Sequence, residues 1–289
     1  MRRKNWKNYS VDELENLLPV SERWENQNLS NDFMFGKVMS DKKACAGVLK
    51  IILPEIEIGE ITFTEIQKPL RDSIDSRGVR FDVYTKSENG KRYDIEIQTT
   101  DNRDLFRRTR AYHAVLGSDI LMKKETRRYS DMPDEFVIFI CTFDPFRLGR
   151  HVYTFRNFCC EDKNLELGDG TSTIFLNAYG KDASVNADIK NLLNFVIGIT
   201  CEDPFIKYLE GLLNTARQNA EWRRNFVLDK FNRQTLIDSG YYDGYDKGFD
   251  KGKLEEKFST AQRLIEMGLS LADVVRATQL SPDDIAKLT

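Results

Sequence analysis

Residues 79–98 read VRFDVYTKSENGKRYDIEIQ, and this stretch decides the fold of the chain. Apolar residues alternate with polar ones on both sides of the SENG connection. Alternation with a period of two is typical of β-strands that bury one face. Asn89-Gly90 between the two runs is a strong signal for a hairpin turn. We therefore predict two antiparallel, half-buried strands joined by a tight turn.

The register of this hairpin follows from the length of its loop. A two-residue loop would pair the polar Asp82 with the apolar Ile97, which mixes the two faces. The three-residue loop 88–90, or a longer loop of the same parity, sets Asp82 opposite Glu96 and keeps the apolar residues together. The three-residue loop also gives Gly90 the left-handed position of a G1 bulge, which glycine adopts without steric cost. We predict this register.

Two carboxylates meet on the polar face of the predicted hairpin. Directly opposed residues have Cβ atoms about 4.5–5.5 Å apart, so Asp82 and Glu96 repel each other unless a cation or a proton lies between them. Mg²⁺ prefers such oxygen ligands and activates bound water next to a phosphate. Gln98 points to the same face and can orient water or phosphate. An ordinary solvated polar face has the same pattern, and spacing alone favours it.

Composition bounds the class of protein. The chain has 289 residues, of which 40% are hydrophobic and 31% charged, as expected of one or two soluble globular domains. No apolar run approaches the roughly 20 residues that span a bilayer, so we expect no membrane segment. The basic start is not followed by an apolar segment, so it is no secretory signal. Five scattered cysteines without a C-x-x-C motif favour a reducing cytoplasm.

The net charge of −3 and the pI of about 5.7 argue against tight, indiscriminate DNA binding, for which a basic domain is expected. A local basic surface remains compatible with these values. With two histidines in the chain, a structural zinc site is not expected.

A helix is predicted after the hairpin, over residues 102–122. Leu105, Tyr112 and Leu116 fall on one side of it, with Thr109 among them.

The same helix carries a basic stripe. Arg103, Arg107 and Arg110 follow at i, i+4 and i+7 on roughly the opposite side. An arginine stripe beside a carboxylate site can hold a DNA backbone. A solvated helix face has the same appearance, and the spacing does not separate the two.

Further strands and helices complete the expected core. The apolar run from 136 to 143 is typical of a strand buried on both faces, and Ile58 to Ile66 alternates weakly. Short strands are expected at 152–155 and 173–176. Strands, then a helix, then a buried strand indicate an α/β layered core. Helices are predicted over about 31–53, from about 185, and from Pro204 to about 237.

Glycine recurs every fourth residue at positions 240, 244, 248 and 252. Each interior glycine costs a helix about 1 kcal/mol relative to alanine, so this segment is either a marginal helix or a flexible tether. Aligned glycines also permit close helix packing.

Two short helices are predicted beyond the glycine segment. Ser270 with Asp273 resembles a capping box, and Ser281-Pro282 with Asp284 repeats the start signal. The pair hints at a helix-turn-helix. The acids that open the last helix would repel phosphate, so a partner-binding or self-association module is the favoured interpretation.

Several segments together resemble one known family. They are LSNDFMFGKVM at 29–39, GVRFDVYTKSENGKRYDIEIQ at 78–98, RRTRAYHAVL at 107–116, DEFVIFICTFDPF at 134–146 and GDGTSTIFLNAYG at 168–180. With these segments in this order, the chain resembles the Rpn / PD-(D/E)XK nuclease family transposases. The resemblance implies a restriction-endonuclease-like core, with a mixed central sheet flanked by helices, and metal-dependent DNA cleavage linked to recombination or transposition.

The resemblance also implies roles for particular residues. Asp82 corresponds to the metal-binding aspartate and Glu96 to the glutamate of the E-x-K motif. Gln98 stands where that motif has lysine, so less positive charge is available and more of the electrostatic burden falls on the metal. Asp32 corresponds to the acidic residue of the first helix and is a candidate further ligand. The implied cofactor is Mg²⁺, with Mn²⁺ as a substitute.

The family pattern also covers the basic helix. Arg107, Arg108, Arg110 and Tyr112 match it, and their expected role is to position the DNA backbone or to contact the active-site strands. Arg107 and Arg110 are the candidates for DNA binding.

The expected organisation ends with a helical C-terminal extension. The segments are an N-terminal extension (1–28), a nuclease-like α/β core (29–183), a helical region packed on it (184–237), a glycine-spaced tether (238–257) and a small helical module (258–289).

Three functions follow as hypotheses. The first is a Mg²⁺-dependent DNA endonuclease, for which cutting both strands of a duplex favours a homodimer. The second is a non-catalytic nucleic-acid- or protein-binding module that retains the fold. The third places the function in the C-terminal helices, with the core as a platform for a dimer.

Overall fold

The structure is a computed structural model that describes residues 8–70, 79–101, 104–122 and 128–287. The chain divides into two compact units. The first, Tyr9–Phe226, holds the sheet and is called the core unit here. The second holds the chain from Val227 onward and is called the tail unit.

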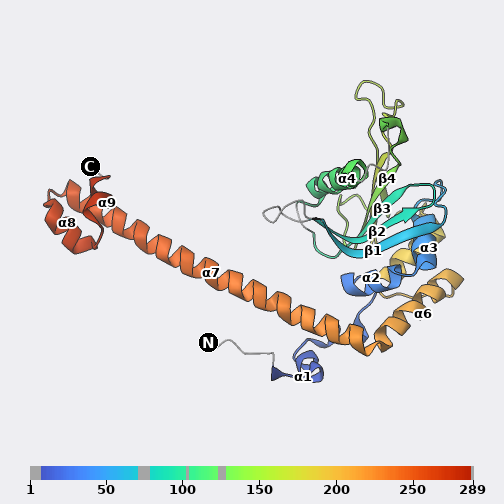
Figure 1. The fold of residues 1–289 in the computed structure, drawn as a ribbon, viewed down its shortest axis with the longest axis horizontal. Helices are drawn as coiled ribbons and strands as arrows, with labels where there is room; N and C mark the ends of the chain where they lie inside the picture. Colours follow the sequence, from blue (N-terminus) through green and yellow to red (C-terminus); the bar gives the residue numbers. More distant parts are fainter. Residues whose placement is uncertain (1–7, 71–78, 102–103, 123–127, 288–289) are drawn as a thin grey trace. The chain divides into compact units, whose positions relative to one another are not determined.

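A mixed six-stranded sheet forms the centre of the core unit, with the order β1-β2-β3-β4-β6-β5 (Figure 1). The first three strands are antiparallel, β3, β4 and β6 are parallel, and β5 is antiparallel to β6. The strands are β1 (Ile61–Leu70), β2 (Val79–Ser87), β3 (Arg92–Gln98), β4 (Glu135–Cys141), β5 (Val152–Phe155) and β6 (Thr171–Asn177). The α/β fold class is therefore confirmed.

The helices lie on both faces of this sheet and continue into the tail unit. The α-helices are α1 (Val11–Asn16), α2 (Asp32–Met39), α3 (Lys42–Ile52), α4 (Leu105–Met122), α5 (Ala187–Val196), α6 (Pro204–Gln218), α7 (Ala220–Glu266), α8 (Leu271–Thr278) and α9 (Pro282–Ala286). Three 3₁₀-helices are η2 (Val20–Glu22), η3 (Trp24–Asn26) and η4 (Tyr129–Asp131). Figure 1 shows α4 on one face of the sheet and α2 and α3 on the other.

The predicted hairpin and its register are confirmed. Val83 pairs with Ile95, and the same register continued by one residue sets Asp82 opposite Glu96. The three-residue loop closes where the Ser87 amide donates to the Lys91 carbonyl at 3.1 Å. Gly90 has a φ of 84°, the left-handed conformation that the bulge requires.

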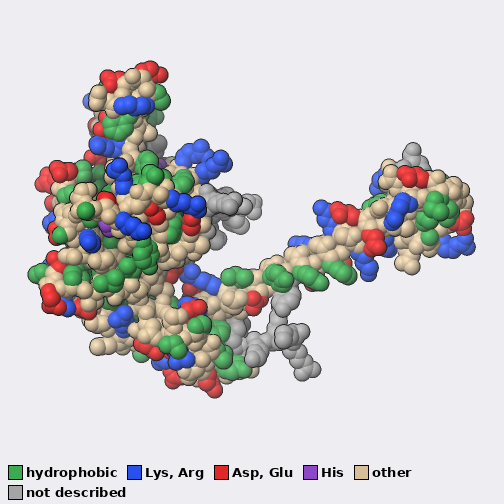
Figure 2. Space-filling view, turned by 180° about the vertical axis from the view of Figure 1, so that it is seen from behind, with side chains coloured by type: hydrophobic (Ala, Val, Ile, Leu, Met, Phe, Trp, Pro, Cys, Tyr) green, Lys and Arg blue, Asp and Glu red, His purple; other side chains and the backbone are tan. Residues whose placement is uncertain are grey.

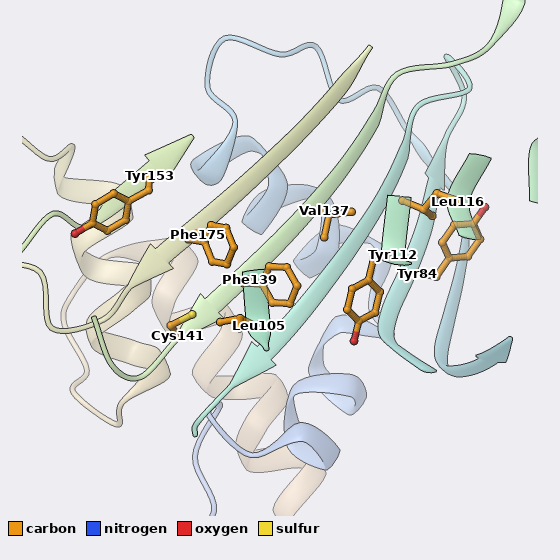
Figure 3. Close-up of a cluster of buried hydrophobic side chains, with 9 residues drawn as sticks. All are labelled: Tyr84, Leu105, Tyr112, Leu116, Val137, Phe139, Cys141, Tyr153 and Phe175. Carbon is orange, nitrogen blue, oxygen red and sulfur yellow. The ribbon is translucent and has the colours of Figure 1, made fainter. Parts of the chain in front are cut away.

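The prediction that the hairpin strands are only half buried is wrong for β3. All seven of its residues are buried, because α4 covers the face that carries the acids. Leu105, Tyr112 and Leu116 of α4 belong to one buried cluster with Phe139 and Phe175 of the neighbouring strands, and Figure 3 shows Leu116 beside Tyr84 of β2. The two phenylalanine rings stack at 5.1 Å between centroids. The acids of β3 therefore lie in a medium of low dielectric constant rather than in water.

Two expected helical regions are each split by a capping residue. The region 31–53 breaks before α3, where the Asp41 side chain accepts from the Ala44 amide at 2.8 Å. The helix expected from Pro204 to about 237 ends at Gln218, because Asn219 caps a new helix through the Trp222 amide at 3.0 Å. The physical reason is the same in both cases: the cap satisfies amides that a helix end leaves without partners.

The segment before α2 is part of the core unit and packs against helices from far along the chain. Trp24 is buried and donates to the Arg217 carbonyl at 2.7 Å. Its ring contacts Phe33 and Phe226. Glu15 accepts from Arg223 at 2.7 Å. These contacts hold the entry to α2, which carries Asp32, in a fixed place.

The tail unit consists of the rest of α7 with α8 and α9. The glycine-spaced segment is helical, so of its two interpretations the helix is the one observed. Apolar side chains line the exposed helix (Figure 2), among them Tyr241, Tyr245 and Phe249. A small core of Ala261, Val274, Leu280 and Ile285 joins the end of α7 to α8 and α9.

The start signals of the last two helices are confirmed. Ser270 caps α8 through the Asp273 amide at 3.2 Å, and Ser281 caps α9 through the Asp284 amide at 3.1 Å. Across the described ranges, no helix combines the length and the apolar character that crossing a membrane requires.

Candidate active site

One cleft, of about 800 Å³, lies at the carboxyl end of β3. Because β3 and β4 are parallel, their carboxyl ends meet at this edge of the sheet, a common location of ligand sites. The start of α2 and the first two turns of α4 complete the wall. Four acids and one base among its described residues carry charge: Asp32, Asp82, Glu96, Asp104 and Arg108.

Asp82 and Glu96 are held by reciprocal contacts across the two strands. Glu96 Oε1 accepts from the Asp82 amide at 2.9 Å, and Asp82 Oδ2 accepts from the Ile97 amide at 3.2 Å. The exposed fraction is 9% for Asp82 and 3% for Glu96, although both residues line the cleft. Each carboxylate is therefore fixed by backbone hydrogen bonds at the floor of a solvent-accessible cleft.

The electrostatics of this pair are those of crowded, desolvated acids. Burial raises the pKa of Glu96 to about 7, and the negative charge of Asp82 acts in the same direction. The Asp82 amide and the Tyr112 hydroxyl stabilise the ionised form and oppose the shift. Tyr112 donates to Glu96 Oε2 at 3.1 Å. Near neutral pH, Glu96 is therefore poised between its two protonation states.

Asp94 is a third acid on this face, and it stands two residues before Glu96 in β3. It is completely buried, and burial followed by the charge of Glu96 raises its pKa well above the ordinary value. It therefore keeps its proton well above the pH at which an ordinary aspartate loses it. The period-two alternation places Asp94 on the polar face, but no motif in the sequence gives it a role.

Gln98 ends the strand, and both ends of its amide are engaged. Its Nε2 donates to the Thr100 carbonyl at 2.9 Å, and its Oε1 accepts from Arg108 Nη1 at 3.1 Å. Arg108 Nη2 donates to the Tyr112 hydroxyl at 2.7 Å and lies 3.8 Å from Glu96 Oε2. Helix α4 thus brings a guanidinium and a phenol to the acids of β3.

Residues 29–186 match the family model described as PD-(D/E)XK nuclease family transposase. The chain belongs to this family. The matched segment contains every charged residue of the cleft, and the mixed sheet flanked by helices is consistent with the restriction-endonuclease-like fold that was expected. No match was found among curated proteins or among solved structures.

The two arginines expected to bind DNA lie away from the cleft of this PD-(D/E)XK family member. Arg107 and Arg110 are exposed on α4 and do not line the cleft, whereas Arg108 does. Arg103 lies outside the described residues. The sequence does indicate that Arg108 faces the sheet. It lies three residues after Leu105, on the same side of the helix as Leu105, Tyr112 and Leu116.

Asp32 reaches the same cleft from the first turn of α2. Its Oδ1 accepts from the Phe33 amide at 2.8 Å, and Asn31 caps the helix through the Met34 amide at 3.2 Å. The structure therefore brings Asp32, Asp82, Glu96 and Gln98 to one cleft.

The donor set of this family member fits a hard divalent cation. Asp82 and Glu96 offer only oxygen ligands, which Mg²⁺ prefers, and their mutual repulsion is the imbalance that a cation relieves. Over the described ranges, no group of three or more His, Cys, Asp or Glu side chains has the geometry of a ready-made metal site. Mg²⁺ commonly takes one or two carboxylates and completes its shell with water and substrate phosphate, so the pair suffices.

Proposed function

We propose that this chain is a metal-dependent DNA endonuclease that hydrolyses phosphodiester bonds. The observation that carries the proposal is the fixed pair Asp82 and Glu96 at the floor of an accessible cleft in a chain of a nuclease family. Asp82 and Glu96, together with Asp32, would hold Mg²⁺ or Mn²⁺. When bound, the metal would lower the pKa of a water molecule and offset the charge that develops on the phosphate.

The side chains of the protein contribute the rest. The backbone hydrogen bonds to Asp82 and Glu96 keep the two carboxylates in place without an ion, so little reorganisation accompanies binding. Gln98 lies at the same wall and orients the attacking water or the scissile phosphate. Arg107 and Arg110, exposed on the adjacent helix, would hold the DNA backbone.

Hydrolysis accounts for strand cleavage alone. Transfer of the cut strand, which recombination or transposition would require, is a further reaction that needs a second DNA site. Cutting both strands of a duplex favours two copies of the chain. A molar mass in solution twice that of the chain would support the homodimer.

The test is nicking of a supercoiled plasmid in Mg²⁺ or Mn²⁺, with EDTA as the blank. Asp82→Asn and Glu96→Gln keep the shape of each side chain but remove its charge. Loss of metal-assisted charge stabilisation is worth several kcal/mol, so we expect the nicking rate of each variant to fall by about 10²–10³-fold. Glu55→Gln, the matched change at an exposed acid outside the cleft, should nick at the wild-type rate.

The opposite result has a definite meaning. DNA binding without nicking, unchanged by either substitution, would identify a non-catalytic binding module that retains the fold. Nicking that persists in EDTA would contradict metal dependence.

A further inference from the structure

The cleft has an excess of negative charge where a phosphate must react. Among its described wall residues, four acids face one base, Arg108. A phosphate under attack gains negative charge, and a positioned cation stabilises it most where water is excluded. Gln98, at the end of β3, carries no charge to supply. The inference drawn from this imbalance rests on the proposed nuclease function.

Arg108 is held at the cleft wall by three contacts. Its guanidinium donates to Gln98 Oε1 at 3.1 Å and to the Tyr112 hydroxyl at 2.7 Å, and it lies 5.5 Å from the centre of the Tyr112 ring. These two hydrogen bonds use two of the five donors of a guanidinium. The arginine is thus oriented, with donors left for a ligand.

The orientation depends on Gln98 and not on the helix alone. Because Gln98 Nε2 donates to the Thr100 carbonyl at 2.9 Å, the amide oxygen is turned towards Arg108. The side chain of Arg108 is 32% exposed and that of Glu96 is 4% exposed. The guanidinium is therefore much more exposed to solvent than the Glu96 carboxylate, in the wall of the cleft that DNA would enter.

We propose that Arg108 is a catalytic residue that contacts the scissile phosphate and supplies the positive charge that Gln98 lacks. Tyr112 is a positioning residue that acts through Arg108, and Gln98 positions Arg108 through its amide oxygen in addition to its proposed contact with water or phosphate. The positive charge that the lysine of the E-x-K motif would place on the strand is thus supplied by the helix. Arg107 and Arg110, which lie outside the cleft, do not share this role.

The first experiment separates catalysis from binding. Arg108→Gln keeps hydrogen-bonding capacity but removes the charge, and we expect kcat for plasmid nicking to fall about a hundredfold, as for loss of one charge-stabilising donor. KM, and the affinity for a labelled duplex in Ca²⁺ measured by fluorescence anisotropy, should stay within about threefold. Arg156→Gln, the same change outside the cleft, should leave nicking unchanged. A fall in DNA affinity with kcat intact would overturn the assignment.

The second experiment places a positive charge on the strand, at position 98. In the Arg108→Gln background, Gln98→Lys should recover at least about tenfold of the lost kcat, whereas Gln98→Lys alone sets two cations together and should lower it. Arg108→Lys, which keeps the charge, should retain more kcat than Arg108→Gln. A double variant no faster than Arg108→Gln, or equal losses for lysine and glutamine at position 108, would contradict the proposal.

A third measurement needs no catalysis. Arg108 lies 3.8 Å from Glu96, so its positive charge opposes that of a bound metal. Mn²⁺ titration by calorimetry should therefore show tighter binding to Arg108→Gln than to the wild type. Weaker binding would mean that Arg108 holds the acids in place, and this result would reject a catalytic role. If the wild type does not nick in any metal, the nuclease function itself fails and the assignment fails with it, whereas a failure confined to the Arg108 variants leaves the function standing.

Discussion

Strand β3 and the middle of α7 reverse the usual places of polar and apolar side chains. In β3, the charged or ionisable Arg92, Asp94 and Glu96 are buried. In α7, Tyr245 and Phe249 are exposed by 61% and 58%. The difference shows that burial in this chain depends on what packs against an element. Helix α4 covers β3, whereas the described part of the tail unit places nothing over the middle of α7.

The two regions are therefore stabilised in different ways. In the core unit, apolar packing around the sheet stabilises the fold enough to offset the desolvation of the acids on β3. Within the described part of the tail unit, the middle of α7 is stabilised along its own length, by pairs such as Lys251 with Glu255 at 3.7 Å and the Tyr245–Phe249 stack at 6.4 Å. Each such pair is worth a few tenths of a kcal/mol.

The largest contrast is expected from one substitution made in both regions. Phe139→Ala removes a fully buried ring that stacks on Phe175, and it should lower the free energy of unfolding by about 3–5 kcal/mol. Phe249→Ala, in the exposed part of α7, should change it by less than about 0.5 kcal/mol. Urea unfolding followed by fluorescence measures both. Equal effects would mean that the middle of α7 is covered in solution.

The next contrast is a dependence of core stability on pH, measured in EDTA. Burial raises the pKa of Glu96 to about 7, against about 4.3 for an unfolded chain. Between these values the unfolded state is ionised while the folded state keeps its proton. The contribution of Glu96 to the free energy of unfolding is therefore fully present below pH ~4. It is lost as the pH rises to 7, by on the order of 3 kcal/mol.

Glu96→Gln is the control for this pH dependence, because its amide does not titrate. Urea unfolding at pH 5 and pH 7.5 should show a smaller loss for the variant than for the wild type. A wild-type core that becomes more stable over this interval would contradict a raised pKa of Glu96 in the folded state.

The smallest contrast concerns glycine. Among the described residues, none comes within 4 Å of a methyl group built on Gly244 or Gly248, so alanine there should stabilise the helix by about 1 kcal/mol at each site. Hydrogen exchange of the α7 amides should slow while that of β4 stays unchanged. Gly47→Ala, in α3 of the core, should have the opposite effect, because its methyl group would clash with the Phe205 ring. Faster exchange in α7 would reveal a packing role for the glycines.

Local patterns were sufficient for the hairpin. Alternation and the parity of the loop at Gly90 fixed which residue of β2 faces Glu96, because a one-residue slip would turn the apolar side chains away from the core. The caps Ser270 and Ser281 were likewise readable, since capping needs only a side chain a few residues away. The breaks at Asp41 and Asn219 were missed, although both are capping residues, because apolar periodicity continues across them.

The sequence by itself determined the strands, the hairpin register and the pair of acids, because these depend on neighbours along the chain and on the two-residue period of a strand. Only the tertiary structure decided that the polar face is covered and that Arg108, rather than Arg107 or Arg110, reaches the cleft. The rotation of α4 about its axis is set by how its apolar residues pack on the sheet. That packing joins segments distant in sequence, and no local pattern contains it.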